Sequence, residues 1–104
     1  PQVFANFDSG NSASLGYLPN EELKILKKWI KNIHIKDRKH SGLTVPLGTG
    51  DTDFELVFAT LREIDYYDDL IIQGARIPGK TYSPKDTCLT YLRFVDEYLN
   101  KYYK

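Results

Sequence analysis

The sequence passes three times from a short apolar stretch, through a loop, into an amphipathic segment. The strand and helix candidates of the three repeats occupy residues 3–8 and 21–31, residues 32–37 and 52–64, and residues 69–74 and 83–104. A strand followed by a helix at this pitch is typical of the βα unit, whose crossover is right-handed and makes successive strands parallel. Tight turns join only antiparallel strands, so these long connections argue against hairpins between the three strands. The sequence therefore predicts an α/β fold.

Two architectures accommodate three parallel βα units: a small open sheet and a slice of a (β/α)₈ barrel. A complete barrel needs about 250 residues, so this chain corresponds to roughly three-eighths of one. The two faces of the strands differ in polarity. The apolar residues Phe7, Ile33 and Ile35 would face the helices, whereas Asp8 and His34 fall on the opposite face. Polar groups at the carboxyl ends of parallel strands mark the functional site in either architecture.

The first two helices carry recognisable start signals. Proline lacks an N–H that the first turn would leave unpaired, and asparagine is a good cap, so Pro19 and Asn20 fit the start of the first helix, which we expect to include Ile30. Thr52 and Glu55 have capping-box spacing and predict the start of the second helix.

The third helix has the clearest start. Ser83 is expected to be the N-cap, Pro84 fits the first helical position, and Asp86 would face the positive end of the helix dipole. One stripe of this helix should face the core, and it consists of Cys88, Leu92, Val95 and Leu99. We therefore interpret the single cysteine as a small buried apolar residue rather than a reactive thiol.

The bulk composition excludes several classes of protein. The 14 Lys and Arg residues balance 14 Asp and Glu residues, so the net charge is zero and no basic stripe is present to follow a phosphate backbone. No apolar run approaches the roughly 20 residues that span a bilayer. No charged-then-apolar leader opens the chain. We expect a protein of the reducing cytoplasm that binds neither nucleic acid nor membrane.

Three side chains could meet at one end of the sheet. Asp8, His34 and Gln73 each fall near the carboxyl end of a strand candidate, on the face away from the helices. A carboxylate and an imidazole suit a divalent ion such as Mn²⁺, Mg²⁺ or Zn²⁺, and an amide oxygen is a weaker ligand. The alternative for His34 is a hydrogen-bonded core histidine, and spacing alone does not separate the two.

Other features allow weaker interpretations. Arg38 and Arg76 follow strand ends and could clamp a phosphate or carboxylate, although surface solubility is the competing explanation. The GTGD segment, residues 48–51, lacks the third glycine of a dinucleotide site and the Gly-Lys ending of a phosphate loop. We expect it to be a tight loop that leads into a helix. Ser9 has no evident base partner.

Longer motifs resemble a known family. The segments FDSGNSASLGY, HIKDR, PLGTGDTDF and IIQGAR together resemble the C-terminal part of the xylose isomerase-like TIM barrels, the sugar and sugar-phosphate isomerases and epimerases. The resemblance implies that residues 1–104 are a partial barrel domain holding the sixth, seventh and eighth βα units. It also implies a small-molecule sugar or sugar-phosphate substrate, and a homo-oligomeric parent is compatible with it. Since Pro1 leads almost at once into a strand, we expect the beginning of the barrel to be missing.

The resemblance also implies a ligand set. Family members generally hold one divalent metal through a Glu, an Asp, a His and a Glu on the fifth to eighth strands. Asp8 matches the Asp position and His34 the His position, whereas Gln73 replaces the last Glu and the first Glu has no counterpart. Asn11 and Arg38 resemble substrate-binding residues of relatives.

Gln73 limits the chemistry that the resemblance allows. In two-base epimerases both glutamates exchange a proton with the sugar carbon, and a metal-stabilised ene-diolate lies between the two steps. An amide has no basic lone pair at neutral pH, so Gln73 could ligate or orient but not take a proton. One-base isomerisation, with Lys36 or Arg38 stabilising negative charge, remains compatible with the sequence.

Two further hypotheses stay open from the sequence. One is a metal-dependent phosphodiesterase like the DNA-repair endonucleases of this barrel type, which use many histidines and a basic face, whereas this chain has only His34 and His40. The other is that the isolated chain, which lacks a metal ligand and a base, is inactive, or that it belongs to a non-catalytic relative. In that case we expect weak metal binding and association through unpaired strand edges.

Overall fold

The chain forms a three-stranded parallel sheet covered by helices on one face. The structure is a computed structural model and describes residues 4–75, 77 and 83–104. The sheet has the order β1-β2-β5, with β1 (Ala5–Asp8) and β5 (Asp69–Ile72) on either side of β2 (Ile30–Ile35). Both neighbouring pairs are parallel, and the register aligns Asp8 with His34 and His34 with Ile71. The predicted α/β fold with parallel strands is thereby confirmed.

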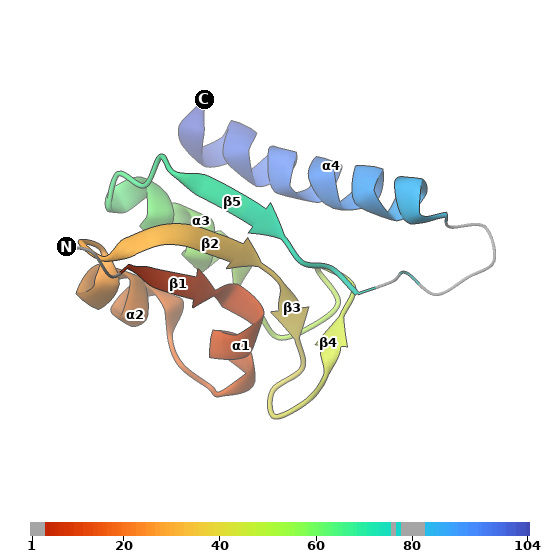
Figure 1. Cartoon of the computed structure of the whole chain (residues 1–104), viewed down its shortest axis with the longest axis horizontal. Helices are drawn as coiled ribbons and strands as arrows, with labels where there is room; N and C mark the ends of the chain where they lie inside the picture. Colours follow the sequence, from red (N-terminus) through yellow and green to blue (C-terminus); the bar gives the residue numbers. More distant parts are fainter. Residues whose placement is uncertain (1–3, 76, 78–82) are drawn as a thin grey trace.

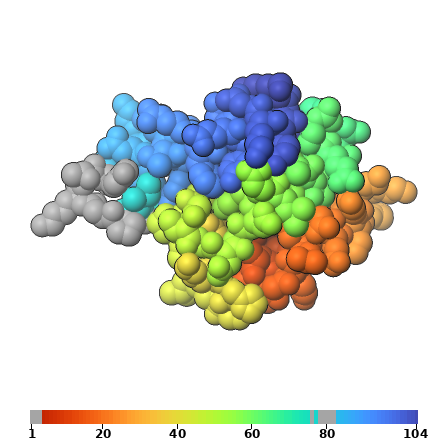
Figure 2. All heavy atoms as spheres, turned by 180° about the vertical axis from the view of Figure 1, so that it is seen from behind, coloured from red at the N-terminus to blue at the C-terminus, as the bar shows by residue number. Residues whose placement is uncertain are grey.

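The helices lie along one side of the sheet. Figure 1 shows α2 (Pro19–Leu26) and α3 (Phe54–Glu63) behind the strands and α4 (Pro84–Tyr103) along β5. The reverse view in Figure 2 looks onto this helix-covered side. At the carboxyl ends of the strands lie the short helix α1 (Ser9–Ser14) and a hairpin of β3 (Asp37–Arg38) and β4 (Thr44–Val45).

The core lies between the sheet and the helices. Phe7, Ile33 and Ile35 point to the helices and are buried, whereas Ile71 on the opposite face is 41% exposed. Because strand residues alternate between faces, one face is dry and the other is left for polar groups. The rest of the buried core comprises Leu23, Ile30, Leu47, Phe54, Val57, Phe58, Leu61, Tyr66, Tyr91 and Val95. Within the described ranges, no helix is long and apolar enough to traverse a bilayer.

The first predicted helix ends earlier than expected. Pro19 occupies the first turn as predicted, but the cap residue is Leu18, and the buried Asn20 side-chain oxygen has no hydrogen-bond partner among the described residues. The predicted inclusion of Ile30 is wrong, because Ile30 begins β2 and pairs in register with Ala5. The spacing of Leu26 and Ile30 suits both structures, and the strand pairing decides between them. Val3, at the start of the first strand candidate, lies outside the described residues.

The second predicted helix has a different cap. The capping box of Thr52 and Glu55 is wrong: the Asp53 carboxylate accepts the Leu56 N–H at 3.0 Å, and α3 begins at Phe54. The Thr52 hydroxyl is turned away from the helix and reaches the backbone of the neighbouring strand ends. Tertiary contacts therefore override the local signal.

The third predicted helix starts as expected but faces the core differently. Ser83 and Asp86 form a full capping box, with Pro84 in the first turn. The interpretation of Cys88 as buried is wrong, since Cys88 is exposed and Leu92 is 55% exposed. Val95 is buried as predicted, but the helix turns Tyr91 into the core beside it, and the face that carries Cys88 and Leu92 stays exposed.

Candidate functional site

The proposed metal-binding side chains line one pocket at the carboxyl edge of the sheet. Asp8 ends β1, His34 lies one residue before the end of β2, and Gln73 directly follows β5. All three line a pocket of about 430 Å³. The Gln73 N–H donates to the Ile35 carbonyl at 2.9 Å, which continues the β2–β5 pairing one residue past the strand. The expected convergence of three strand ends is therefore present.

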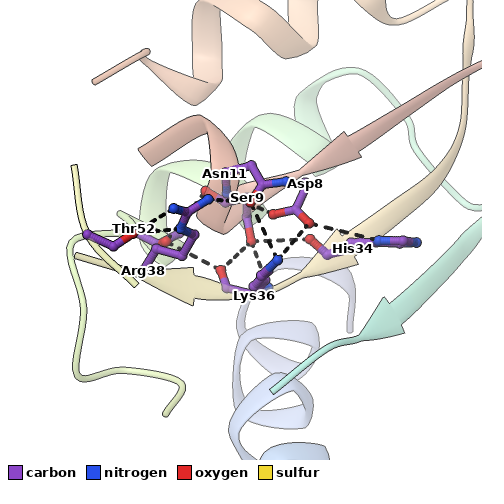
Figure 3. A network of polar contacts seen from close by, with 8 residues as sticks. Asp8, Ser9, Asn11, His34, Lys36, Arg38 and Thr52 are labelled. Atoms are coloured by element: carbon purple, nitrogen blue, oxygen red, sulfur yellow. Dashed lines mark hydrogen bonds and ion pairs between the residues drawn. The ribbon is translucent and has the colours of Figure 1, made fainter. Parts of the chain in front are cut away.

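Asp8 is held in place by the helix that follows it. It is the N-cap of α1, and its Oδ1 accepts the Asn11 N–H at 2.8 Å, so the helix start orients the carboxylate. Its Oδ2 lies 3.9 Å from His34 Nδ1 and 3.8 Å from Lys36 Nζ. Figure 3 shows these groups facing one another. A separation of 3.9 Å is too long for a hydrogen bond, so Asp8 Oδ2 and His34 Nδ1 face each other without a direct bond.

These atoms are suitable donors for a divalent cation. Ligand atoms about 2.1 Å from one ion lie between about 3 and 4 Å apart, a range that includes the separation of Asp8 Oδ2 and His34 Nδ1. Carboxylate, imidazole and amide oxygen are together a mixed donor set of a kind that suits Mn²⁺, Mg²⁺ or Zn²⁺. In the described residues, no cluster of three or more His, Cys, Asp or Glu side chains is arranged to hold a metal. Asp8 and His34 would therefore supply only part of a coordination sphere.

Two cations flank the pocket and converge on one amide. Lys36 Nζ and Arg38 Nη1 lie 3.4 and 2.9 Å from the Asn11 side-chain oxygen. The Arg38 guanidinium also donates through Nε and Nη2 to the Gly42 carbonyl, at 3.0 and 2.6 Å. Lys36 and Asn11 line the pocket, whereas Arg38 does not and instead orients Asn11. The proposed substrate contact of Arg76 falls outside the described residues.

Two buried residues that support the site are absent from the predicted set. Ser9 is buried, and its hydroxyl donates to the carbonyls of His34 and Lys36 at 3.2 and 2.7 Å. Asp37 is fully buried and accepts hydrogen bonds from the loop at residues 48–52. A signal for Asp37 exists in the sequence, because it continues the alternation of Ile33 and Ile35. A carboxylate in the apolar phase of a strand must find internal partners.

Comparison with known proteins places this site in a family. The sequence profile of the xylose isomerase-like TIM barrel family matches residues 1–86. The chain belongs to that family. Its parallel βα units and the polar residues at the strand ends are thus those of a TIM barrel domain.

Three similar proteins are each longer than this chain. Inosose dehydratases from Geobacillus kaustophilus and Clostridium perfringens are each 28% identical to it, over 91% and 94% of this chain and 35% and 39% of their own lengths. A solved structure, a xylose isomerase domain protein from Planctomyces limnophilus, superposes with a TM-score of 0.75 at 28% identity, covering 98% of this chain and 39% of that one. The chain thus spans little more than a third of these relatives.

Proposed function

We propose that this chain is part of a divalent-metal-dependent isomerase or epimerase that removes a proton beside the carbonyl group of a sugar or cyclitol. The observation that carries the proposal is the convergence of Asp8, His34 and Gln73 on one pocket at the carboxyl edge of the sheet. Because the chain spans about a third of its relatives, we assign the activity to a whole barrel in which these residues are one wall. Loss of water from an inosose can begin with the same proton removal, which accommodates the dehydratase relatives.

Each residue of the site has a distinct role in this proposal. Asp8, His34 and Gln73 would hold the ion, which supplies positive charge where negative charge develops on the substrate oxygens. The Lys36 ammonium would donate hydrogen bonds to those oxygens, and Asn11 would orient a hydroxyl group. Gln73 cannot accept a proton, so the base must come from elsewhere in the barrel. A single base favours isomerisation over two-base epimerisation.

The pocket wall favours an uncharged polyol over a sugar phosphate. Its described charged groups are the carboxylates of Asp8 and Glu22 and the ammonium of Lys36. That ammonium lies 3.8 Å from Asp8, and the Arg38 fork is already occupied by Gly42. A phosphate dianion needs cations or backbone N–H groups that are free to bind it. Amides and hydroxyls, contributed by Asn6, Asn11, Ser12, Tyr17 and Gln73, suit hydroxyl groups instead.

The test is deuterium exchange, which detects proton removal whatever product follows. The complete barrel is incubated with Mn²⁺ and uncharged ketoses or inososes in D₂O, and the substrate carbon beside the carbonyl is analysed by NMR. We expect exchange in the parent and its loss in Asp8→Asn and His34→Ala. His40→Ala is the matched control, because the second histidine does not line the pocket. Exchange that persists in His34→Ala, or that needs no divalent ion, would contradict the proposal.

A further inference from the structure

Asp37 is a buried carboxylate between two cationic neighbours that both reach the pocket wall. The carboxylate is fully buried, whereas the side chains of Lys36 and Arg38 reach the same oxygen of Asn11. Since successive residues of an extended chain point to opposite sides, Asp37 turns away from Asn11 while both neighbours turn toward it. Its own bonds are therefore made elsewhere.

The partners of Asp37 are backbone N–H groups of one loop. Oδ2 accepts from Gly48 and Gly50 at 2.9 and 2.8 Å, and Oδ1 accepts from Thr52 at 3.1 Å. Hydrogen bonds to an ionised acceptor are stronger than neutral ones. Burying a carboxylate is unfavourable unless such bonds replace its lost hydration. The loop at residues 48–52 and Asp37 therefore hold each other in one arrangement.

The loop at residues 48–52 also bonds and packs against the backbone on both sides of Asp37. The Asp51 N–H donates to the Arg38 carbonyl at 2.8 Å. A Cβ on Gly50 would lie 2.7 Å from that same carbonyl oxygen and would overlap Asp37 Oδ1. Thr52 Oγ1 reaches the Lys36 carbonyl at 3.3 Å. The loop thus fixes the peptide groups on both sides of Asp37.

We propose that Asp37 is a positioning residue that, through the loop at residues 48–52, aims Lys36 and Arg38 at Asn11. With the peptide groups around Asp37 fixed, the two flanking side chains leave the backbone in fixed directions toward Asn11 (Figure 3). Its importance for turnover rests on the proposed function. The geometric claim does not, because it is tested without substrate or metal.

The first test is Asp37→Asn, read by NMR on the whole chain. Asparagine keeps the shape of the side chain but places an NH₂ group against one or more loop N–H groups, so hydrogen bonds between residue 37 and the loop are lost. In the folded variant, checked by far-UV circular dichroism, we expect the Asn11 side-chain amide and Arg38 Nε–H signals to shift, with faster exchange of Arg38 Nε–H. Asp53→Asn is the control, because this nearby carboxylate caps α3 and asparagine caps equally well.

A second variant separates the effect of the loop's position from the effect of the charge of residue 37. Gly50→Ala keeps the Asp37 carboxyl group but displaces the loop, and we expect it to move the same Asn11 and Arg38 signals. Movement of those signals in Asp37→Asn with none in Gly50→Ala would overturn the proposal, because charge rather than loop position would then be responsible. Unchanged signals in both variants, with a freed Gly50 N–H, would overturn it as well.

Hydrogen exchange in the unaltered chain decides the matter if neither variant folds. The Gly50 and Thr52 N–H groups and the Arg38 Nε–H should then exchange through one opening event, with the same free energy of opening and the same dependence on urea. Exchange of Arg38 Nε–H by an independent route would overturn the proposal.

Discussion

Ser9 and Lys36 exchange two hydrogen bonds across the carboxyl edge of the sheet. The Ser9 hydroxyl donates to the Lys36 carbonyl at 2.7 Å and accepts the Lys36 N–H at 2.9 Å. Ser9 immediately follows Asp8, so this pair holds the end of β1 against the end of β2 beyond the last paired strand residues. The same edge carries the Asp8 carboxylate and the Lys36 ammonium, which lie 3.8 Å apart.

Ser9→Ala should loosen this edge. The change removes a buried hydroxyl and leaves the Lys36 N–H without its partner, at a cost of about 1–3 kcal/mol in the free energy of unfolding. Urea denaturation measures the loss. Ser12→Ala is the matched control, because Ser12 is equally part of α1 but bonds the Glu22 carboxylate, which borders the open pocket. We expect a smaller effect there, and equal losses would contradict the role of the Ser9–Lys36 pair.

Gln73→Glu should strengthen Mn²⁺ binding by the chain. A carboxylate would join Asp8 and His34 at the same pocket, and a hard cation prefers it to a neutral amide. We expect affinity to rise by about tenfold or more, the scale on which even outer groups change metal affinity. Electron paramagnetic resonance of free Mn²⁺ gives the affinity. Gln73→Leu should weaken binding, and identical affinity in the Glu and Leu variants would exclude Gln73 from the metal site.

Much of the sheet was predictable because burial of one face makes apolar residues alternate with polar ones along each strand. Phe7, Ile33 and Ile35 alternate with polar residues, and the structure buries all three. The convergence of Asp8, His34 and Gln73 follows from parallel strands, since their carboxyl ends share one edge. Position in the fold, more than local composition, made these side chains predictable.

The parts that sequence reasoning missed depend on contacts between distant segments. The sequence presents Ser9 only as a nucleophile without a base, yet Asp8 caps a short helix there and the Ser9 hydroxyl bonds the Lys36 backbone 27 residues away. Thr52 matched a capping box, but its hydroxyl bonds backbone carbonyls instead. Cys88 matched an apolar stripe, but the helix rotates so that Tyr91 enters the core. Local patterns do not encode such choices, because the competing partners come from elsewhere in the chain.

Tyr103→Phe should reduce the loss of folding stability at alkaline pH. Burial raises the pKa of the Tyr103 phenol from 10.0 to about 12, and its hydroxyl donates to the Tyr66 carbonyl at 2.8 Å. The raised pKa means that the neutral form is favoured on folding, so this stabilisation is complete below pH 10 and is lost as the pH rises toward 12. Phenylalanine cannot titrate, so the urea midpoint of the Tyr103→Phe variant should fall less than that of the parent as the pH rises from 10 to 12.

Two other tyrosines matter for that experiment, Tyr66 as a second titrating group and Tyr17 as the control. Burial also raises the pKa of Tyr66, so part of the alkaline decline remains in Tyr103→Phe. Tyr17→Phe serves as the control because Tyr17 is 56% exposed, and it should retain the full decline. A Tyr103→Phe curve parallel to that of the parent from pH 9 to 12 would refute the assignment.

Ile71→Lys should suppress self-association of the isolated chain. β1 and β5 are the outer strands of the described sheet, and Ile71 on β5 is 41% exposed on the face without helices. Unpaired strand edges beside exposed apolar groups pair with other chains, and an added lysine opposes that pairing. Sedimentation velocity should show concentration-dependent oligomers for the parent and a shift toward monomer for Ile71→Lys. Ile25→Lys is the control, because Ile25 is 77% exposed but lies on α2, away from either edge. A monomeric parent, or equal suppression by both variants, would show that the strand edges do not drive association.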